Sequence, residues 1–387
     1  MSNNDEIKSH AKVDLCAPNL KGNELRYVSD AIKSGWVSGA GEYVSRFEKA
    51  ISDYVGAQDA VACQSGTAGL HLSLIALGLQ ANDEIIVPTV TFVAAVNPVR
   101  YVGAYPIFMD CDDSLCMNAE KLEDFFNEKC VFDGEILKNK LTNRRIKLII
   151  VVHVFGNMGN MCKILRLAEF YKLKVIEDAT EALGTYYKSG LLKGKYAGTM
   201  GDIGVFSFNA NKIITTGGGG AVVSHEKKIL DKVRFFSTQA KNDSFYFIHN
   251  EIGFNYRMSN VQAAIGLAQI EQIEEFVKIK NKNYNSYKKH GINLLPFDEK
   301  IRSNKWFYAH LAQKKEELMK HLMKNNIEVR PLWMLVHLQK CYKCFQSYKI
   351  EKANYFLKRI VNLPCGSGLS ESSIVKIAEI IKNFYDF

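Results

Sequence analysis

Short runs rich in Ile and Val alternate with helical patterns between residues 60 and 225, and this alternation constrains the fold more than any other feature of the chain. The apolar runs predict strands at 60–63, 84–87, 105–109, 148–153, 174–177, 203–208 and 220–224. The segments between them predict helices at 68–77, 92–102, 119–129 and 163–171. Apolar strands separated by helices favour an α/β domain whose mostly parallel sheet is covered on both faces.

The pattern changes after residue 226. Ser259 followed by Gln262 matches a capping box, which predicts the start of a long helix running through Ile270 and Phe276. The remaining residues up to 387 mix short strands with amphipathic helices. A chain of 387 residues is long enough for two units, so we predict a large domain at 1–240 and a long helix with a smaller α/β domain at 241–387.

Composition argues against several classes of protein. No apolar run approaches the roughly 20 residues that a membrane helix needs, and the polar N-terminus lacks the apolar centre of a signal peptide. Nine cysteines at irregular spacing do not form a disulfide framework, which favours a reducing cytoplasm. Cys341 and Cys344 have no second ligand pair nearby, so no metal site is predicted. The net charge of +9 suits a negatively charged small substrate, and because no nucleic-acid recognition motif is visible, we expect binding to neither nucleic acid nor a membrane.

Residues 64–78, QSGTAGLHLSLIALG, predict a turn between a strand and a helix. Free backbone N–H groups at the start of a helix, beside small side chains, make an anion site. Ser65 and Thr67 can add hydroxyl donors to such a site. The same residues are equally typical of simple helix capping with nothing bound.

Residues 175–184, VIEDATEALG, place Asp178 at the C-terminal end of a predicted strand, where open α/β sheets bind ligands. Strand alternation sends Glu177 and Asp178 to opposite faces, which argues against a metal cage completed by Glu181. A cap for the next helix and a partner for a cationic ring nitrogen remain as alternatives for Asp178.

Lys212 lies in FSFNANKIITTGGGG, residues 206–220, a run without any other charged residue. Covalent amine catalysis needs a lysine that can be neutral, and an apolar, glycine-flanked surrounding favours this. The glycines alone are a weak signal, because they often mark only a tight turn. Together, a phosphate cradle at residues 65–67, the carboxylate of Asp178 and the amine of Lys212 are what pyridoxal 5′-phosphate (PLP) requires.

Six segments resemble, in order, successive motifs of the DegT/StrS-type nucleotide-sugar aminotransferases: SGTAGLHLSLIALG, PTVTFVAAVNPV, VVHVFGN, VIEDATEALG, GDIGVFSFNANKIITTGGGG and GFNYRMSNVQAAIG. With the regions beside them, the resemblance covers residues 20–340. It implies the fold-type I architecture of PLP-dependent transferases, in which a mostly parallel mixed sheet flanked by helices is followed by a smaller α/β C-terminal domain. It also implies a homodimer whose active sites are shared between the subunits.

The resemblance also implies which residues hold the cofactor. Lys212 would bond to the PLP aldehyde, and Asp178 would keep the ring nitrogen protonated. Glu181 stands where many members have Gln or His near the phenolic oxygen of PLP; because two facing anions repel, we expect a shared proton or a displaced side chain. The other implied contacts are the phosphate cradle at Ser65, Gly66, Thr67 and Ser207, ring stacking by Phe92, and phosphate contacts by Asn255 of the partner subunit and by Arg257 beside it.

The same resemblance implies the reaction. Lysine rather than histidine at position 212 favours transamination over the dehydration that some relatives perform. L-glutamate would give its amino group to a UDP-linked keto sugar, and the wording of the motifs most resembles enzymes acting at C4 of UDP-4-keto-6-deoxy-N-acetylglucosamine. Alternatives are another keto sugar, aminated at C3 or as another C4 epimer, and a non-catalytic regulatory or interaction homologue. The implied substrate contacts are Trp36, Ser38, Arg330, His337 and His153, the last of which fits a structural role equally well.

Overall fold

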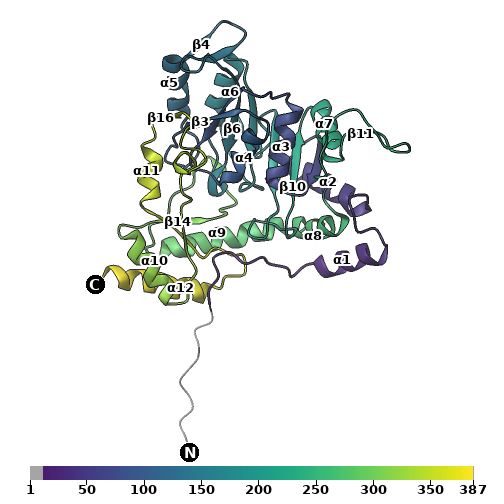
Figure 1. Cartoon of the computed structure of the whole chain (residues 1–387). Coiled ribbons are helices and arrows are strands. Elements are labelled where there is room, and N and C mark those ends of the chain that lie inside the picture. Colours follow the sequence, from purple (N-terminus) through teal and green to yellow (C-terminus); the bar gives the residue numbers. More distant parts are fainter. Residues whose placement is uncertain (1–11, 387) are drawn as a thin grey trace, which may run out of the picture.

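The structure is a computed structural model that describes residues 12–386 (Figure 1). Within this range the centre is a ten-stranded mixed sheet with the main order β1-β10-β9-β7-β6-β2-β3-β16. Strand β10 runs antiparallel to β1 and β9, and the pairs from β9 to β16 are parallel. A hairpin of β4 and β5 adds to the sheet beside β6. The bounds are β1 (Asp59–Cys63), β2 (Glu84–Pro88), β3 (Tyr105–Met109), β4 (Cys130–Phe132), β5 (Leu137–Asn139), β6 (Arg145–Val152), β7 (Lys174–Asp178), β9 (Ile203–Ser207), β10 (Gly220–Ser224) and β16 (Ser347–Tyr348).

Helices cover both faces of this sheet. Val61 of β1 points into one core, and its neighbour Ala62 points into a second core on the opposite face. The first core is shared with α3 (Gly66–Ala76) and α7 (Lys227–Ser237), and the second with α2 (Glu42–Val55), α5 (Ala119–Lys129) and α6 (Met161–Phe170). Because successive strand residues point to opposite faces, strands that are apolar along their length are buried on both sides. The predicted α/β class is confirmed.

Every strand predicted from the sequence is present. The largest difference is at β6, which begins at Arg145 rather than at 148. The predicted helix 92–102 is interrupted, since a short 3₁₀ helix at Val93–Ala95 precedes α4 (Asn97–Tyr101). Pro98 explains the interruption: it lacks the N–H that a helix interior requires, and it lies in the first turn of α4 instead. The helices α2 and α7 lie where none is predicted.

The capping box at Ser259 is confirmed, with hydrogen bonds in both directions between Ser259 and Gln262. The single long helix through Phe276 is wrong, because α8 (Asn260–Ile270) ends and α9 (Ile273–Lys289) begins after a break at Gln272. The backbone of Gln272 has φ −111° and ψ 0°, and its side-chain amide donates to a carboxylate oxygen of Glu24 at 3.1 Å. Figure 1 shows α8 and α9 arranged end to end along the lower side of the sheet.

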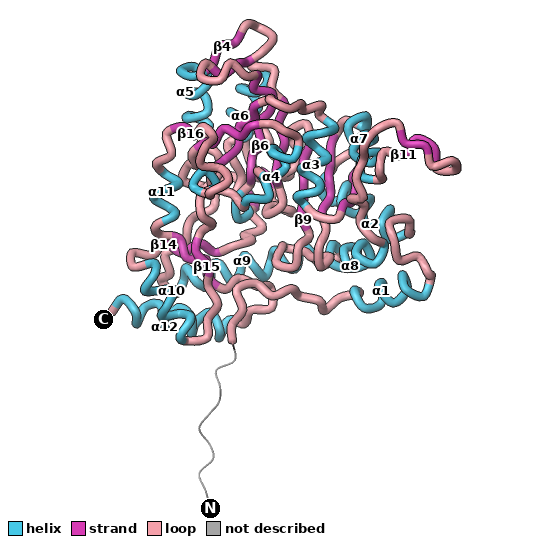
Figure 2. The backbone as a smooth tube through the Cα atoms, viewed as in Figure 1, coloured by secondary structure: helices cyan, strands magenta, loops and turns pink. Residues whose placement is uncertain are grey.

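The C-terminal part forms a three-stranded antiparallel sheet of order β14-β17-β15. Its strands β14 and β15 are labelled in Figure 2. Two other strands from the C-terminal part of the sequence pair with strands of the N-terminal part. Strand β16 joins the main sheet, and β13 pairs with β8. The two parts are therefore interleaved, and the division at residue 240 stays a prediction. The remaining bounds are α1 (Glu24–Lys33), β8 (Tyr186–Tyr187), β11 (Lys241–Asp243), β12 (Ile248–His249), β13 (Ile301–Arg302), β14 (Tyr308–Leu311), α10 (Lys315–Lys324), β15 (Arg330–Pro331), α11 (Lys352–Leu357), β17 (Ile360–Leu363) and α12 (Glu371–Tyr385).

None of the helices between residues 12 and 386 has the length and apolar character needed to cross a membrane.

Candidate active site

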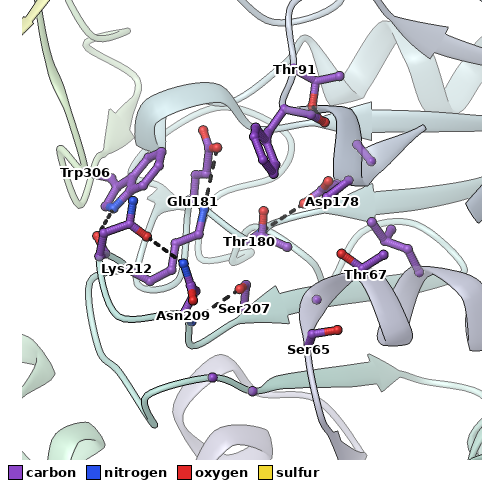
Figure 3. A pocket seen from close by; sticks show the side chains of 18 of the residues that line it. Ser65, Thr67, Thr91, Asp178, Thr180, Glu181, Ser207, Asn209, Lys212 and Trp306 are labelled. Carbon is purple, nitrogen blue, oxygen red and sulfur yellow. Dashed lines mark hydrogen bonds and ion pairs between the residues drawn. The ribbon is translucent and has the colours of Figure 1, made fainter. Parts of the chain in front are cut away.

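A cavity of about 320 Å³ lies at the C-terminal ends of β7 and β9, beside the start of α3 (Figure 3). Asp178 is the last residue of β7, and Ser207 is the last residue of β9. Both side chains therefore project from the edge of the sheet at which parallel strands present ligand-binding groups. The walls combine segments that are far apart in the sequence, from the turn at residues 65–67 to Trp333.

The turn at residues 65–67 closes one end of the cavity. The hydroxyl of Ser65 accepts a hydrogen bond from the backbone of the first turn of α3 at 3.0 Å, as expected of a helix cap. Gly66 and Thr67 also line the cavity, where the unpaired first-turn N–H groups and the helix dipole provide positive potential. A Cβ atom added to Gly66 would lie 3.0 Å from the Cβ of Ser207, so a larger residue would crowd this wall. The turn therefore caps the helix and also offers an anion site.

Asp178 faces the cavity from the end of β7. The side chain is almost completely buried, and its carboxylate accepts a hydrogen bond from the backbone N–H of Thr180 at 3.1 Å. Burial raises the pKa of Asp178 above its ordinary value, while the bonds from Thr180 and the positive charge of Lys212 oppose the increase. A buried carboxylate in this state is stabilised by a further cation, such as a protonated ring nitrogen in the cavity.

Glu177 and His153 lie on the other side of the sheet from this cavity, as strand alternation predicts for Glu177. The Glu177 carboxylate lies 2.8 Å from Nε2 of His153 and accepts three backbone N–H groups of the loop that precedes β9. Both side chains are 0% exposed. The structure does not support the substrate contact expected of His153, because the ring is enclosed and bonded to Glu177. It favours the structural alternative.

Lys212 enters the cavity from the loop that follows β9. Its Nζ lies 3.6 Å from Oε1 of Glu181 and 3.9 Å from the centre of the Trp306 ring, and the side chain is 13% exposed. The other oxygen of Glu181 accepts the backbone N–H of Phe155 at 2.8 Å. Burial raises the pKa of Glu181 to about 7, and the charge of Lys212 opposes this increase. The amine is therefore not in the uncharged surroundings that its sequence neighbours indicate, and the expected conflict at Glu181 is relieved by pairing with Lys212.

Phe92 lines the cavity as expected, with 54% of its surface exposed and its ring centre 6.4 Å from that of Trp333. Six other expected residues are not part of the cavity wall formed by residues 12–386. They are Trp36, Ser38, Asn255, Arg257, Arg330 and His337. Trp36, Ser38 and Asn255 are exposed, which leaves them open to contact with another subunit.

Arg257 is engaged within its own subunit. Its guanidinium donates to Glu48 at 2.5 Å and to the carbonyl oxygen of Ala62 at 3.3 Å. Glu48 also accepts a hydrogen bond from Arg234 at 3.0 Å, so three charged side chains share one partly buried network. The structure does not support a phosphate contact by Arg257 in its own cavity, because both of these bonds point the guanidinium elsewhere.

Arg330 lines a second cavity of about 680 Å³, which shares Asn211 and Trp333 with the first. The guanidinium of Arg330 is exposed and lies 2.7 Å from Glu328. The two adjoining cavities together leave room for a substrate that extends beyond the first cavity.

His337 does not line the first cavity. Its Nδ1 is 2.6 Å from the hydroxyl oxygen of Thr89, and burial lowers the pKa of the ring. Thr89 precedes Thr91, which does line the cavity. His337 is therefore not a wall residue and contacts Thr89, two residues before the wall residue Thr91.

Several wall residues are absent from the sequence predictions: Thr91, Thr180, Asn209, Asn211, Trp306 and Trp333. Asn209 and Asn211 both lie within three residues before Lys212 in the sequence, and this proximity could have identified them as site residues. Trp306 has no such local signal. It reaches the site from another part of the chain and donates its indole N–H to the carbonyl oxygen of Asn211 at 2.7 Å.

A family model of the DegT/DnrJ/EryC1/StrS aminotransferases matches residues 18–382. The chain belongs to this aminotransferase family. It is 38% identical over 380 residues to a GDP-perosamine synthase of Escherichia coli O157:H7, covering 96% of this chain and 98% of the relative. It is 30% identical over 404 residues to a UDP-4-amino-4,6-dideoxy-N-acetyl-beta-L-altrosamine transaminase of Campylobacter jejuni (strain 81-176), covering 95% of this chain and 98% of the relative. A DegT DnrJ EryC1 StrS aminotransferase from Brucella abortus superposes with a TM-score of 0.87 at 26% identity, covering 94% of this chain and 96% of that one.

As a member of the DegT/DnrJ/EryC1/StrS family, the chain is a PLP-dependent aminotransferase, and the fold-type I prediction is confirmed. The residues of the cavity fit this cofactor. The anion site at residues 65–67 suits its phosphate, Asp178 suits its ring nitrogen, and Lys212 offers an amine to its aldehyde. The volume of about 320 Å³ is also within the range of small-molecule sites.

Proposed function

We propose that this aminotransferase moves an amino group from L-glutamate to C4 of a 4-keto-6-deoxy sugar linked to a nucleoside diphosphate. The observation that carries the proposal is the meeting, in one cavity, of Lys212, Asp178 and the helix start at residues 65–67. The adjoining cavity beside Arg330 gives space for the rest of a long, anionic substrate.

The protein's own groups divide the work in this proposal. PLP, when bound, supplies an aldehyde that carries the amino group between the two substrates. Asp178 would hold a proton on the ring nitrogen, and the first-turn N–H groups of α3 would hold the phosphate. Nζ of Lys212 would move a proton to and from the reacting carbon of the substrate. Glu181, with a pKa of about 7 and 3.6 Å from Nζ, is placed to take up and return a proton at that amine.

The nucleotide has two candidates. The relative that is 38% identical is named for a GDP-linked sugar, and the relative that is 30% identical is named for a UDP-linked sugar. The residues of the sequence motifs favour the UDP-linked sugar, whereas the higher sequence identity to the GDP-perosamine synthase favours the GDP-linked sugar. We place the GDP-linked 4-keto-6-deoxy sugar first and the UDP-linked N-acetylated sugar second.

The test is a two-stage assay of the PLP-loaded protein. L-glutamate alone should convert the visible spectrum to that of the aminated cofactor and release 2-oxoglutarate, and Lys212→Ala should do neither. The aminated protein is then offered a panel of GDP- and UDP-linked sugars, with the keto group at C3 or at C4, and the product is identified by mass spectrometry. A spectrum that glutamate leaves unchanged would favour the non-catalytic alternative. Conversion of only the 3-keto sugars would overturn the assignment to C4.

We also propose that the working form is a homodimer in which Trp36, Ser38 and Asn255 reach the cavity of the partner. Their exposure and the resemblance of their motifs support this arrangement. Lys212→Ala and Asn255→Ala are purified separately, mixed and allowed to exchange subunits. The mixture should be more active than the sum of the two separate variants. In a mixed dimer, one cavity combines Lys212 from one subunit with Asn255 from the other. A mixture that exchanges subunits without gaining activity would contradict the shared site.

A further inference from the structure

Two thiols that the proposed reaction does not use lie together beside the loop that carries Lys212. Cys16 belongs to the segment that precedes α1, and Cys365 follows the end of β17. All nine cysteines of the chain are free thiols. This pair is distinct from the exposed Cys341 and Cys344, which lie on the surface after β15.

The backbone holds the two segments side by side. The N–H of Cys365 donates to the carbonyl oxygen of Leu15 at 2.7 Å, and the Cys365 thiol lies 3.5 Å from the same oxygen. A Cβ atom added to Gly366 would lie 3.7 Å from Cα of Cys16, which shows how closely the chains pass. The two cysteines therefore lie on backbone segments that pass side by side.

The two thiols differ in environment. Cys365 is completely buried, whereas Cys16 is partly exposed and lines the second cavity. The neighbouring Cys365 thiol lowers the pKa of Cys16, and the charges of Lys280 and Lys212 act in the same direction, against the effect of burial. Burial raises the pKa of Cys365. One thiol is thus reachable and readily ionised, and the other is protected and adjacent, which is the arrangement of an attacking and a resolving cysteine.

We propose that Cys16 and Cys365 form a peroxide-sensitive dithiol pair, which a hydroperoxide converts to a disulfide beside the active-site loop. The Cys16 thiolate attacks the hydroperoxide, the O–O bond breaks, and the leaving oxygen takes a proton, which gives a sulfenic acid at Cys16. The sulfur of Cys365 then attacks that of Cys16, the S–O bond breaks, and the departing hydroxide takes the thiol proton as water. The hydroperoxide is the oxidant, both thiols are oxidised, and a small dithiol restores them by exchange.

The pair is connected to the site through Asn211. The Cys16 thiol donates to the carbonyl oxygen of Asn211 at 3.5 Å, and Asn211 directly precedes Lys212. A disulfide would fasten the N-terminal segment to the end of β17 beside this carbonyl oxygen. A reversible disulfide of this kind is consistent with a reducing compartment, where lasting structural disulfides are rare.

The test uses the PLP-loaded full chain and hydrogen peroxide. After treatment, free thiols are alkylated and the unreduced protein is digested for mass spectrometry. We expect a cross-linked peptide pair containing Cys16 and Cys365, the loss of two titratable thiols, and recovery of both with dithiothreitol. The rate of reaction at Cys16 should rise with pH around a midpoint below the value of about 8.5 that is ordinary for a free cysteine.

Variants separate the two steps. Cys365→Ser, or Cys365→Ala if the serine is not tolerated in the buried site, should leave a sulfenic acid at Cys16 that a dione reagent traps. Cys16→Ser should abolish the cross-link, and the double variant Cys341→Ser with Cys344→Ser should retain it as the matched control. Oxidation that consumes Cys341 or Cys344 while Cys16 and Cys365 stay alkylatable would overturn the proposal. A cross-link that persists in Cys16→Ser would overturn it as well.

Discussion

Nζ of Lys212 and Oε1 of Glu181 lie 3.6 Å apart, and both side chains are largely withdrawn from solvent at 13% and 3% exposure. The two residues come from different segments, after β9 and after β7. A carboxyl group buried alone resists ionisation, and a nearby ammonium opposes that effect. Because the pKa of Glu181 is about 7, both the free energy of unfolding and the number of protons bound at this pair depend on pH near neutrality.

Glu181→Gln should remove part of the pH dependence of stability. The pKa of Glu181 is about 7 in the folded protein and 4.5 without the fold, so the unfolded state releases this proton first as pH rises. The contribution of this group to the free energy of unfolding is complete below about pH 4.5 and is lost as the pH rises through about 7. Relative to Glu181→Gln, the wild type without PLP should lose up to about 3 kcal/mol of unfolding free energy between about pH 5 and pH 8. Urea unfolding at both pH values measures this difference. The exposed Glu135→Gln serves as control, and an equal pH dependence in all three proteins would contradict the expectation.

Asp178→Asn should slow transamination without unfolding the protein. The amide cannot hold a proton on a ring nitrogen, and a hydrogen bond to a charged group is worth about 1.5–3 kcal/mol, or about 10- to 150-fold in rate. The neighbour Glu177→Gln is a matched control on the opposite face. It should lower the unfolding free energy by about 1–3 kcal/mol through its buried N–H partners and leave the intrinsic rate of folded protein nearly unchanged. Single-turnover spectra with glutamate and urea unfolding distinguish the two effects, and a similar loss of rate in both variants would count against the assignment.

Lys212→Ala should abolish covalent attachment of PLP. Borohydride reduction of the loaded wild type should fix the label on a single peptide containing Lys212, and the variant should stay unlabelled. Lys305→Ala is the control. Burial lowers the pKa of Lys305 to about 8. If PLP attached to the most reactive amine, the label would therefore be on Lys305. We expect the cavity, and not amine reactivity, to direct the label to Lys212. Label recovered on Lys305 in the wild type would refute that view.

The large sheet could be predicted from the sequence because each of its strands is an apolar run bounded by turn residues, and that signal is local. That Asp178, Gly66 and Lys212 line one cavity could be predicted for a similar reason, since each stands next to a strand end or a turn. The ends of helices were harder: the break at Gln272 depends on a hydrogen bond to Glu24, which lies far away in the sequence.

The parts of the site that could not be predicted are those made by tertiary contacts. Glu181 looks like an unpaired anion in the sequence, and only the fold brings Lys212 to it. Arg257 follows a family motif, yet its guanidinium is held by Glu48, a residue of α2 where no helix is predicted. His153 occupies a conspicuous strand end, but its bond to Glu177 on the far face follows only from the packed structure.

Glu48→Gln should be strongly destabilising. Its side chain is 7% exposed and bonds Arg257 at 2.5 Å and Arg234 at 3.0 Å. Hydrogen bonds to charged groups are worth about 1.5–3 kcal/mol, and we expect a loss in this range because Arg234 is 36% exposed and Arg257 is left in a partly buried site without compensation. Glu42→Gln on the same helix removes an exposed pair with Arg46 and should cost less than about 1 kcal/mol. Urea unfolding of the two variants measures the contrast, and equal losses would show that the network does not act as a buried one.

Trp306 should stabilise Lys212 through the face of its indole ring, and a double-mutant cycle can isolate this contribution. Nζ of Lys212 lies 3.9 Å from the ring centre, and the ring is held from behind by Phe307, stacked at 4.0 Å with an angle of 10°. A largely desolvated cation–π contact is worth about 0.5–2 kcal/mol. Trp306→Leu, Lys212→Met and the double variant, compared by urea unfolding without PLP, should show a coupling energy in that range.

Trp306→Phe should separate the ring face from the indole N–H. Phenylalanine keeps an aromatic face for Lys212 but cannot donate to the carbonyl oxygen of Asn211, a bond of 2.7 Å in the wild type. Most of the coupling to Lys212 should therefore survive in the phenylalanine background, while unfolding free energy falls by about 0.5–1.5 kcal/mol for the lost hydrogen bond. Trp333→Leu provides the control, since Trp333 lines the same cavity from another segment. If Trp333 couples to Lys212 as strongly as Trp306 does, the effect belongs to the cavity as a whole and not to the ring beneath the amine.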